Sequence, residues 1–297
     1  MVWVIRNIIQ TIIIIIIGIN RLPQKSMPEN QKRPSKQLLI TLITAVVIII
    51  SAAFLILFLP PFPRGGEDIP TKTDMEMVFI PSGDFLMGDE DLDPNMRPQH
   101  TVYLDAYWID QTEVTNAQYL VCIQDGGCSG AEPSQYINEE SKSDHPVIQV
   151  TWQDAVDFCE WAGKSLPSEA QWEKAARGID GRLYPWGDES PNPRLANYYQ
   201  NESSSTPVGS YPLGASPYGA LDMAGNVSEW TADWYSPDYY KNSPRRNPHG
   251  PEAGERHVKR GGTWFVTVDF VLRSAFRKYT GSDRSYHIGF RCVYELN

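Results

Sequence analysis

The chain has 297 residues, 41% of them hydrophobic and 21% charged, which is enough to bury the core of one large globular domain or two small ones. The formal net charge is −10 and is uneven, because residues 1–37 carry +5 and the remainder carries −15. An acidic domain without a basic stripe excludes nucleic acid as a partner.

Residues 38–59 contain no charged side chain over 22 positions. As a helix this segment would rise about 33 Å, which spans a hydrocarbon core of about 30 Å. Basic residues cluster just before it, and acidic residues follow it. Because basic flanks stay on the cytoplasmic side, we predict a single-pass anchor in the cell membrane, with residues 1–37 in the cytoplasm and the C-terminal domain outside.

Residues 8–19 are almost all isoleucine but short. They are either a first membrane-spanning helix, which would make a hairpin, or a segment that is not translated, because Met27 begins an ordinary signal-anchor sequence. We favour a start at Met27. A cleaved signal peptide is a further alternative, but no small-residue cleavage site follows Leu59. Residues 60–74 are rich in Pro, Gly and charge and predict an exposed linker, so compact sequence begins at Met75.

Short strands and a polar loop are expected at the start of the domain. Residues 77–80 and 83–87 predict a hairpin that turns at Pro81 and Ser82. Alternating aspartates in residues 89–93 resemble the start of a calcium loop, but a proline stands where an EF-hand needs glycine, so we interpret the run as a solvated loop. Aromatic and β-branched residues at 103–109 predict a strand.

Three helices follow, and two of them have clear start signals. The first is expected from about Thr115. Thr151 and Ser168 each precede, by three positions, a residue whose side chain can bond back to the cap. Gly163 and Gly178 are placed to end these two helices. Capped helices in front of many short strands predict an α+β fold.

The next segments are less regular. Residues 181–217 are rich in Gly, Pro, Asn and Ser and predict a long irregular segment that needs a tether. Residues 229–235 are aromatic and form either a platform for stacking a ligand or part of the core. We favour the core, because large aromatic side chains do most of the burying in loop-rich domains.

The segment 258–293 holds the most constrained residues of the chain. Gly261 and Gly262 permit a tight turn or the close approach of another segment. The residues at 263–265 have a strand-like composition, a loop follows, and residues 287–293 predict a final strand. The segment therefore predicts a strand, a loop and a strand.

The four cysteines include no C-x-x-C pair and have no closely spaced histidine, which argues against a zinc site. Four buried free thiols would be expected in a cytosolic chain. The predicted membrane segment favours disulfides instead, and Gly126 and Gly127 allow a tight loop between Cys122 and Cys128. We therefore predict that these two cysteines are bonded.

Six blocks of sequence, in order and spacing, resemble the formylglycine-generating enzyme family, also called the sulfatase-modifying factor family. They are VFIPSG (78–83), LPSEAQWE (166–173), GNVSEW (225–230), GGTW (261–264), LRSAFR (272–277) and IGFRCV (288–293). The resemblance covers roughly residues 75–297. It implies the fold of that family, which is similar to the C-type lectin architecture, and a disulfide between Cys159 and Cys292.

The resemblance also bears on catalysis. Catalytic members of the family carry two cysteines, five residues apart, that bind copper(I) and oxidise a substrate cysteine. The matching positions here are Val266 and Val271. Thiolates are soft, nucleophilic copper ligands, and an isopropyl group is neither ligand nor nucleophile. We therefore expect no copper site and no reaction of the family's kind.

Structural calcium is a further implication of the resemblance, and hard oxygen ligands suit that ion. The positions matching the family's ligands are Asn197 and Tyr198 for one ion, and Gly225, Val227 and Glu229 for another, partly through backbone carbonyls. The alternative is that Asn226 and Glu229 only cap and hydrogen-bond a turn.

No other catalytic signature is present, since the sequence has neither an H-E-x-x-H nor a G-x-S-x-G motif. The first functional hypothesis is a membrane-anchored extracytoplasmic module that binds a peptide or small ligand without oxidising it. The second is an oxidoreductase of the same family that acts on a protein or small thiol through a different site, near Thr263, Asp269 and Arg273. A structural surface protein is a third class.

Overall fold

The computed structural model describes residues 75–129, 137–199, 201–281 and 284–296. The predicted N-terminal segment, membrane anchor and linker lie outside the described residues. Within the part that is described, no helix combines the length and the apolar composition needed to cross a bilayer.

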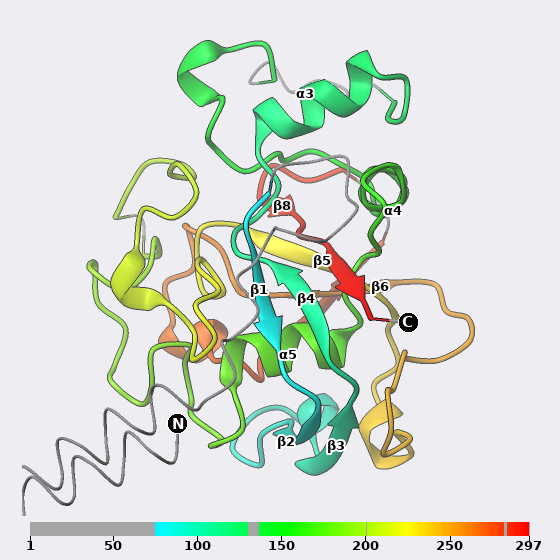
Figure 1. Cartoon of the computed structure of the whole chain (residues 1–297). Coiled ribbons are helices and arrows are strands. Elements are labelled where there is room, and N and C mark those ends of the chain that lie inside the picture. Colours follow the sequence, from blue (N-terminus) through cyan, green and yellow to red (C-terminus); the bar gives the residue numbers. More distant parts are fainter. Residues whose placement is uncertain (1–74, 130–136, 200, 282–283, 297) are drawn as a thin grey trace, which may run out of the picture. The chain divides into compact units, whose positions relative to one another are not determined.

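The strands of the first half build a sheet and a separate ladder. The sheet is antiparallel, in the order β1 (Met77–Ile80), β4 (Tyr107–Asp110) and β9 (Val293–Glu295). The ladder joins β2 (Gly83–Met87) to β3 (His100–Leu104). Figure 1 shows β1 and β4 side by side, with the ladder at their lower end. The final strand of the chain thus completes a sheet that begins at its first strand.

The expected hairpin of β1 with β2 is wrong, because β1 pairs with β4 and β2 pairs with β3. The turn between β1 and β2 is held by helix α5 (Glu169–Arg177) instead. The ammonium of Lys174 on this helix donates to the carbonyl oxygens of Pro81 at 2.7 Å and Gly83 at 3.0 Å. A contact over more than ninety residues therefore replaces the local turn, and the two strands diverge.

A second sheet has four strands in the order β7 (Arg277–Thr280), β6 (His257–Arg260), β5 (Ser228–Trp234) and β8 (Ile288–Gly289), with β5 and β8 parallel. Trp230 on β5 is fully buried and donates from Nε1 to the carbonyl oxygen of Val150 at 3.2 Å. For Trp230, the interpretation of the aromatic stretch as core is confirmed.

Two other strands differ from the predictions in extent. The strand expected at 103–109 breaks at Asp105, whose N–H donates to Asn247 Oδ1 at 3.0 Å and not to a neighbouring strand. The final strand expected at 287–293 is divided between β8 and β9. The N–H of Cys292, between them, donates to the side chain of Asp110 at 2.8 Å. In both places a side chain takes the hydrogen bond that a longer ladder would use.

The helices begin where their caps predict. They are α3 (Asn116–Gln124), α4 (Trp152–Trp161) and α5. Thr115, Thr151 and Ser168 each accept the N–H of the third helical residue, whose side chain bonds back to the cap N–H. Helix α5 ends at Gly178, which has φ 72°, and α4 ends just before Gly163. Local hydrogen bonds therefore set these boundaries.

Short 3₁₀ turns fill several connections among the described residues: η1 (Pro94–Met96), η2 (Glu140–Lys142), η3 (Pro212–Gly214), η4 (Tyr239–Lys241) and η5 (Asp269–Leu272). In the described residues of 181–217, η3 is the sole regular element, which confirms the irregular segment predicted there. The fold is α+β, as predicted.

Two apolar clusters form most of the core. One lies under α3 and α4 and includes both disulfides, Cys122–Cys128 and Cys159–Cys292, whose Cα atoms are 5.3 and 5.7 Å apart. The other lies between the strands β1 to β4 and helix α5. Both predicted disulfides are confirmed. The second of them ties α4 to the segment between β8 and β9, so it joins the middle of the domain to its end.

Helix α5 is buried along its whole length, and its two carboxylates are paired with the second sheet. The carboxylate of Glu169 binds Arg277 of β7 through two bonds of 2.7 Å. Glu173 binds Arg260 of β6 at 2.6 Å. Because a buried charge is costly unless it is paired, these ion pairs fix α5 against β6 and β7.

Asp233 on β5 gives a pH-dependent prediction. Burial, and then the nearby Glu169 carboxylate, raise the pKa of Asp233 to about 8. A folded-state pKa above the unfolded value stabilises the protein fully at low pH, and this contribution is lost as pH rises through about 8. Replacing Asp233 by Asn should therefore flatten the fall in unfolding free energy between about pH 4 and about pH 8, where the carboxyl accounts for up to about 1.4 kcal/mol per pH unit.

Urea unfolding of the wild type and of Asp233→Asn across this range would measure the difference. The amide oxygen can still accept the N–H of Glu169, which lies 2.7 Å from Asp233 Oδ2, so this hydrogen bond at the start of α5 is retained. Identical pH profiles for the two proteins would contradict the raised pKa.

Candidate functional site

The segment after β6 turns sharply at Gly261 and Gly262, which have φ of +91° and +76°. A Cβ on Gly262 would lie 3.0 Å from a methyl group of Leu272 and 3.2 Å from the carbonyl oxygen of Val271. Residues 263–265, whose composition predicts a strand, form a turn instead. Glycine at these positions lets the chain fold back closely onto η5.

Thr263, one of the predicted polar candidates, is 4% exposed. Its carbonyl oxygen accepts the N–H of Val266 at 3.2 Å, which closes the turn. Its hydroxyl oxygen has no hydrogen-bond partner among the described residues. Thr263 is therefore placed as part of the turn, beside Val266.

The two valines pack in different places. Val266 is half-buried against a cluster that includes Tyr184, Tyr198 and Leu272. Val271, also half-buried, packs against a second cluster, formed by Leu92, Met96, Ala275 and Phe276. Apolar packing thus surrounds both positions.

A hollow of ≈ 340 Å³ opens next to η5, and we call it the Phe270 crevice. The ring of Phe270 is 46% exposed and meets Phe276 edge to face, at 5.8 Å between centroids. The crevice is lined by Asp91, Leu92, Asp93, Pro94, Arg97, Phe270, Arg273 and Phe276. Two distant segments therefore build it, the loop before β3 and the residues around η5.

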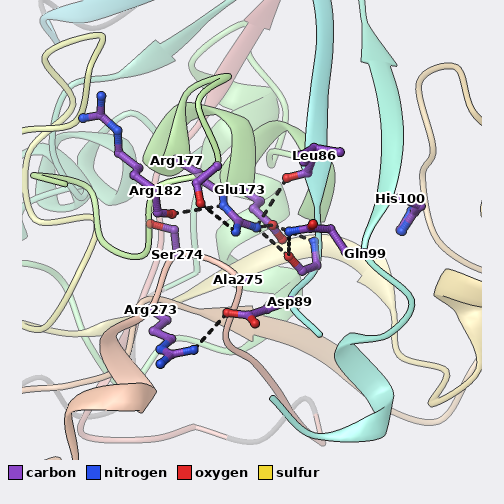
Figure 2. A network of polar contacts seen from close by, with 12 residues as sticks. Leu86, Asp89, Gln99, His100, Glu173, Arg177, Arg182, Arg273, Ser274 and Ala275 are labelled. Atoms are coloured by element: carbon purple, nitrogen blue, oxygen red, sulfur yellow. Dashed lines mark hydrogen bonds and ion pairs between the residues drawn. The ribbon is translucent and has the colours of Figure 1, made fainter. Parts of the chain in front are cut away.

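Arg273 joins these two segments. Its guanidinium pairs with the Asp89 carboxylate at 3.1 Å, across 184 positions in the chain (Figure 2). Asp89 is 6% exposed, so the interpretation of residues 89–93 as a solvated loop is wrong at this residue. Asp91 and Asp93 are exposed, as expected, and have no ion pair among the described residues. Asp269 is also exposed, at the start of η5.

Helix α5 holds the loop side of the crevice in place. Glu173 accepts the N–H of Gly88 at 2.9 Å, and Arg177 donates to the carbonyl oxygen of Gly88 at 2.6 Å. Gln99 donates to the same oxygen at 3.2 Å. Figure 2 shows Glu173, Arg177 and Gln99 converging there, beside the pair of Arg273 and Asp89. The loop that carries Asp91 and Asp93 thus begins from a fixed point.

Comparison with known proteins identifies the family. A model described as the sulfatase-modifying factor enzyme 1-like domain matches residues 66–296. The chain belongs to this family. The resemblance found in the sequence is therefore confirmed.

Similar proteins of the family differ in their overall length. The formylglycine-generating enzyme of Streptomyces coelicolor is 35% identical, over 77% of this chain and 92% of its own. A serine/threonine-protein kinase, pkn1 of Chlamydia caviae, is 39% identical over 75% of this chain, and the chain spans only 38% of that protein. The structure of PvdO from Pseudomonas aeruginosa superposes with a TM-score of 0.65 and 27% identity, covering 75% of this chain and 95% of that one.

Asn197, which matches a ligand of the family's first calcium ion, lies next to Gly225, which matches a ligand of the second. A Cβ on Gly225 would lie 2.3 Å from the carbonyl oxygen of Asn197, so the two segments touch. That oxygen accepts the N–H of Asn226 at 2.8 Å, and the side-chain oxygen of Asn197 is without a partner among the described residues. Tyr198 is 7% exposed and packs in the cluster of Val266.

The second set fits a cation poorly. Val227 is fully buried, and the carboxylate of Glu229 is bound by Arg291 at 2.7 and 2.8 Å and by Trp172 Nε1 at 2.9 Å. Glu229 would have to give up Arg291 to bind calcium. In the described part of the chain, no three His, Cys, Asp or Glu side chains are grouped to hold a metal. Calcium therefore stays a prediction, and an unchanged melting temperature in a calcium titration would argue against it.

A pair of buried acids near Arg291 was not predicted. Glu113 is 0% and Asp222 is 6% exposed. Burial is the main cause that raises the pKa of each, and for Glu113 the charge of Asp222 adds to it. Asn226 donates to Glu113 at 3.1 Å, and the N–H of Gly209 donates to Asp222 at 2.6 Å. No local sequence pattern marks residues so far apart, so only the fold reveals this pair.

Proposed function

We propose that the chain is a membrane-anchored, extracytoplasmic binding module that holds a peptide or small ligand in the Phe270 crevice without oxidising it. The observation that carries this proposal is the lack of any available thiol. By the sequence resemblance, Val266 and Val271 match the positions of the family's catalytic cysteines, and all four cysteines of the chain are bonded in disulfides.

The chemistry of the residues supports this view. Oxidation of a cysteine through copper(I) needs soft thiolate ligands, and a disulfide sulfur in the core supplies none. Cys122, Cys159 and Cys292 are 0% exposed and Cys128 is 9% exposed. Apolar packing occupies the surroundings of both valines. We accordingly propose that no copper binds beside them.

The crevice has the features of a ligand site. Its ≈ 340 Å³ lies within the range of about 300–1,000 Å³ that is usual for small-molecule pockets. It combines an aromatic wall, from Phe270 and Phe276, with the carboxylates of Asp91 and Asp93, for which no ion pair is found in the described part of the chain. An aromatic wall provides contact area, and a few charged groups fix the orientation of a ligand.

The anchor belongs to the same proposal. The uncharged segment at residues 38–59 would hold the domain at the cell membrane, and the linker at 60–74 would carry it away from the surface. All four cysteines of the chain are bonded in two disulfides, which agrees with an oxidising compartment outside the cytoplasm.

Selection of a displayed peptide library on the purified domain would test the binding function. We expect enriched peptides whose affinity falls at least about tenfold when Phe270 is replaced by Ala, because an anchoring aromatic side chain typically contributes more than about 1.4 kcal/mol. Leu213→Ala is a matched control, since Leu213 is 62% exposed and lies outside the crevice. Enrichment of no sequence, or equal affinity for wild type and Phe270→Ala, would contradict the proposal.

A further inference from the structure

A second hollow, of ≈ 180 Å³, lies beside Trp264, two residues after the glycine pair, and we call it the Trp264 pocket. Its polar side is formed by Asn116, Lys142, His145 and the serines at 203–205. Its apolar side includes Ile148, Trp264 and Tyr286. It shares no lining residue with the Phe270 crevice, so it is a separate site.

Asn116 presents an acceptor that no described residue satisfies. The side chain is 1% exposed, and its amide N–H donates to the carbonyl oxygen of Lys142 at 2.9 Å. This bond fixes which end of the amide is which, and it leaves Oδ1 without a partner among the described residues. A buried acceptor left without a hydrogen bond is destabilising. Asn116 therefore favours a ligand that carries a hydrogen-bond donor.

Lys142 adds the complementary requirement. Lys142 is one of the lining residues, is half-buried, and takes part in no ion pair within the described residues. An ammonium that faces a partly enclosed pocket without a carboxylate partner favours an anionic group. The pocket thus favours a ligand that carries both a hydrogen-bond donor and an anionic group.

His145 limits the charge of that anion. Its Nδ1 lies 3.2 Å from the hydroxyl oxygen of Ser205. Burial, and then the charge of Lys142, lower the pKa of His145, so the ring is neutral at neutral pH. The exposed Asp144 next to it adds negative charge at the rim. One ammonium beside a neutral imidazole suits a monoanion such as a carboxylate better than a doubly charged phosphate.

The remaining walls suit an apolar group of modest size. Ile148 is 7% exposed, Trp264 is half-buried, and Tyr286 is 61% exposed at the mouth. A volume of ≈ 180 Å³ corresponds to about six water molecules, which is the size of a small organic acid. The hydroxyl of Ser203 supplies a further donor to its anionic end, whereas the hydroxyl of Ser204 donates to the carbonyl oxygen of Ser205 at 3.1 Å and that of Ser205 lies beside His145.

We propose that the Trp264 pocket binds a small carboxylate that carries a hydrogen-bond donor on its α-carbon and an apolar side chain. The carboxylate lies against Lys142 and the hydroxyl of Ser203. The α-amino, α-amido or α-hydroxyl group donates to Asn116 Oδ1, and the side chain packs on Ile148 and Trp264. A free amino or hydroxy acid and the C-terminal residue of a peptide share this chemistry.

Titration calorimetry on the full chain, with a set of leucine analogues, separates the requirements. L-Leucine, its α-hydroxy analogue and N-acetyl-L-leucine carry both groups, L-leucinamide lacks the carboxylate, and 4-methylpentanoate lacks the donor. We expect the last two to bind at least about tenfold more weakly than the best of the first three, because each removes one buried polar partner. Preference for N-acetyl-L-leucine would identify a peptide C-terminus as the source, and preference for either of the other two would identify a free acid.

Lys142→Met provides the test within the chain. Lys142 has no ion-pair partner among the described residues, and its contact with Asn116 runs through its backbone, so the variant should fold normally. We expect its affinity for the best probe to fall at least about tenfold. Lys241→Met is the matched control, since Lys241 pairs on the surface with Asp238. No binding of any of the three complete probes at millimolar concentration, or unchanged affinity in Lys142→Met, would overturn the proposal.

Discussion

Loss of the Cys159–Cys292 disulfide, by replacing both cysteines with Ala, is expected to lower the unfolding free energy by about 5 kcal/mol. The two residues are 133 positions apart, so the bond removes much of the conformational freedom of the unfolded chain. It also joins α4 to the segment between β8 and β9, in the same apolar cluster as Phe158 and Phe290. Urea unfolding monitored by tryptophan fluorescence would measure the change.

The Cys122–Cys128 disulfide provides the matched comparison. It closes a loop with a sequence separation of 6, so its removal should lower the unfolding free energy by only about 2 kcal/mol. The ordering of the two losses is the sharper test, because strain and cavities affect both variants. An equal loss, or a larger loss for the short loop, would show that loop closure does not govern these bonds.

Replacement of Arg291 by Met should lower the unfolding free energy by about 3–5 kcal/mol, the range found when one partner of a buried ion pair is removed. Arg291 is 0% exposed and binds the Glu229 carboxylate through two hydrogen bonds, of 2.7 and 2.8 Å. It also donates to the carbonyl oxygens of Asp110, Gln111 and Leu221. The variant leaves a buried carboxylate with Trp172 as its remaining partner.

Two comparisons sharpen this test by urea unfolding. Adding Glu229→Gln to Arg291→Met should recover part of the loss, because it removes the uncompensated charge. Arg245→Met, which removes a surface pair with Asp84, should change stability little, since both side chains are largely exposed. A loss in Arg291→Met no larger than that in Arg245→Met would contradict the assignment of a buried ion pair.

Local signals in the sequence predicted where the helices begin. The strands were predicted less well, because their pairing depends on segments far apart in the chain. The caps at Thr115, Thr151 and Ser168 use bonds over three residues, which the sequence shows directly. The hairpin of β1 with β2 failed because Lys174, far along the chain, holds the turn. The break at Asp105 likewise depends on a loop more than a hundred residues away.

The candidate site was predictable only in part. The resemblance located Val266, Val271 and Arg273, and the structure adds what surrounds them. The pairing of Arg273 with Asp89 spans 184 positions, and the loop that carries Asp91 faces Phe270 only in the folded chain. The alternating aspartates at 89–93 predicted a solvent-exposed loop. The same sequence pattern occurs whether or not the folded chain brings an arginine beside one of the aspartates.

We propose above all that this chain does not oxidise a substrate cysteine and binds a ligand instead. The most direct test incubates the purified protein with copper(I), oxygen and a sulfatase-type cysteine peptide, and follows the peptide by mass spectrometry. The formylglycine-generating enzyme of Streptomyces coelicolor, treated in the same way, is the positive control. We predict that the peptide stays unmodified with this chain, and conversion of its cysteine to formylglycine above the copper-only background would contradict the account.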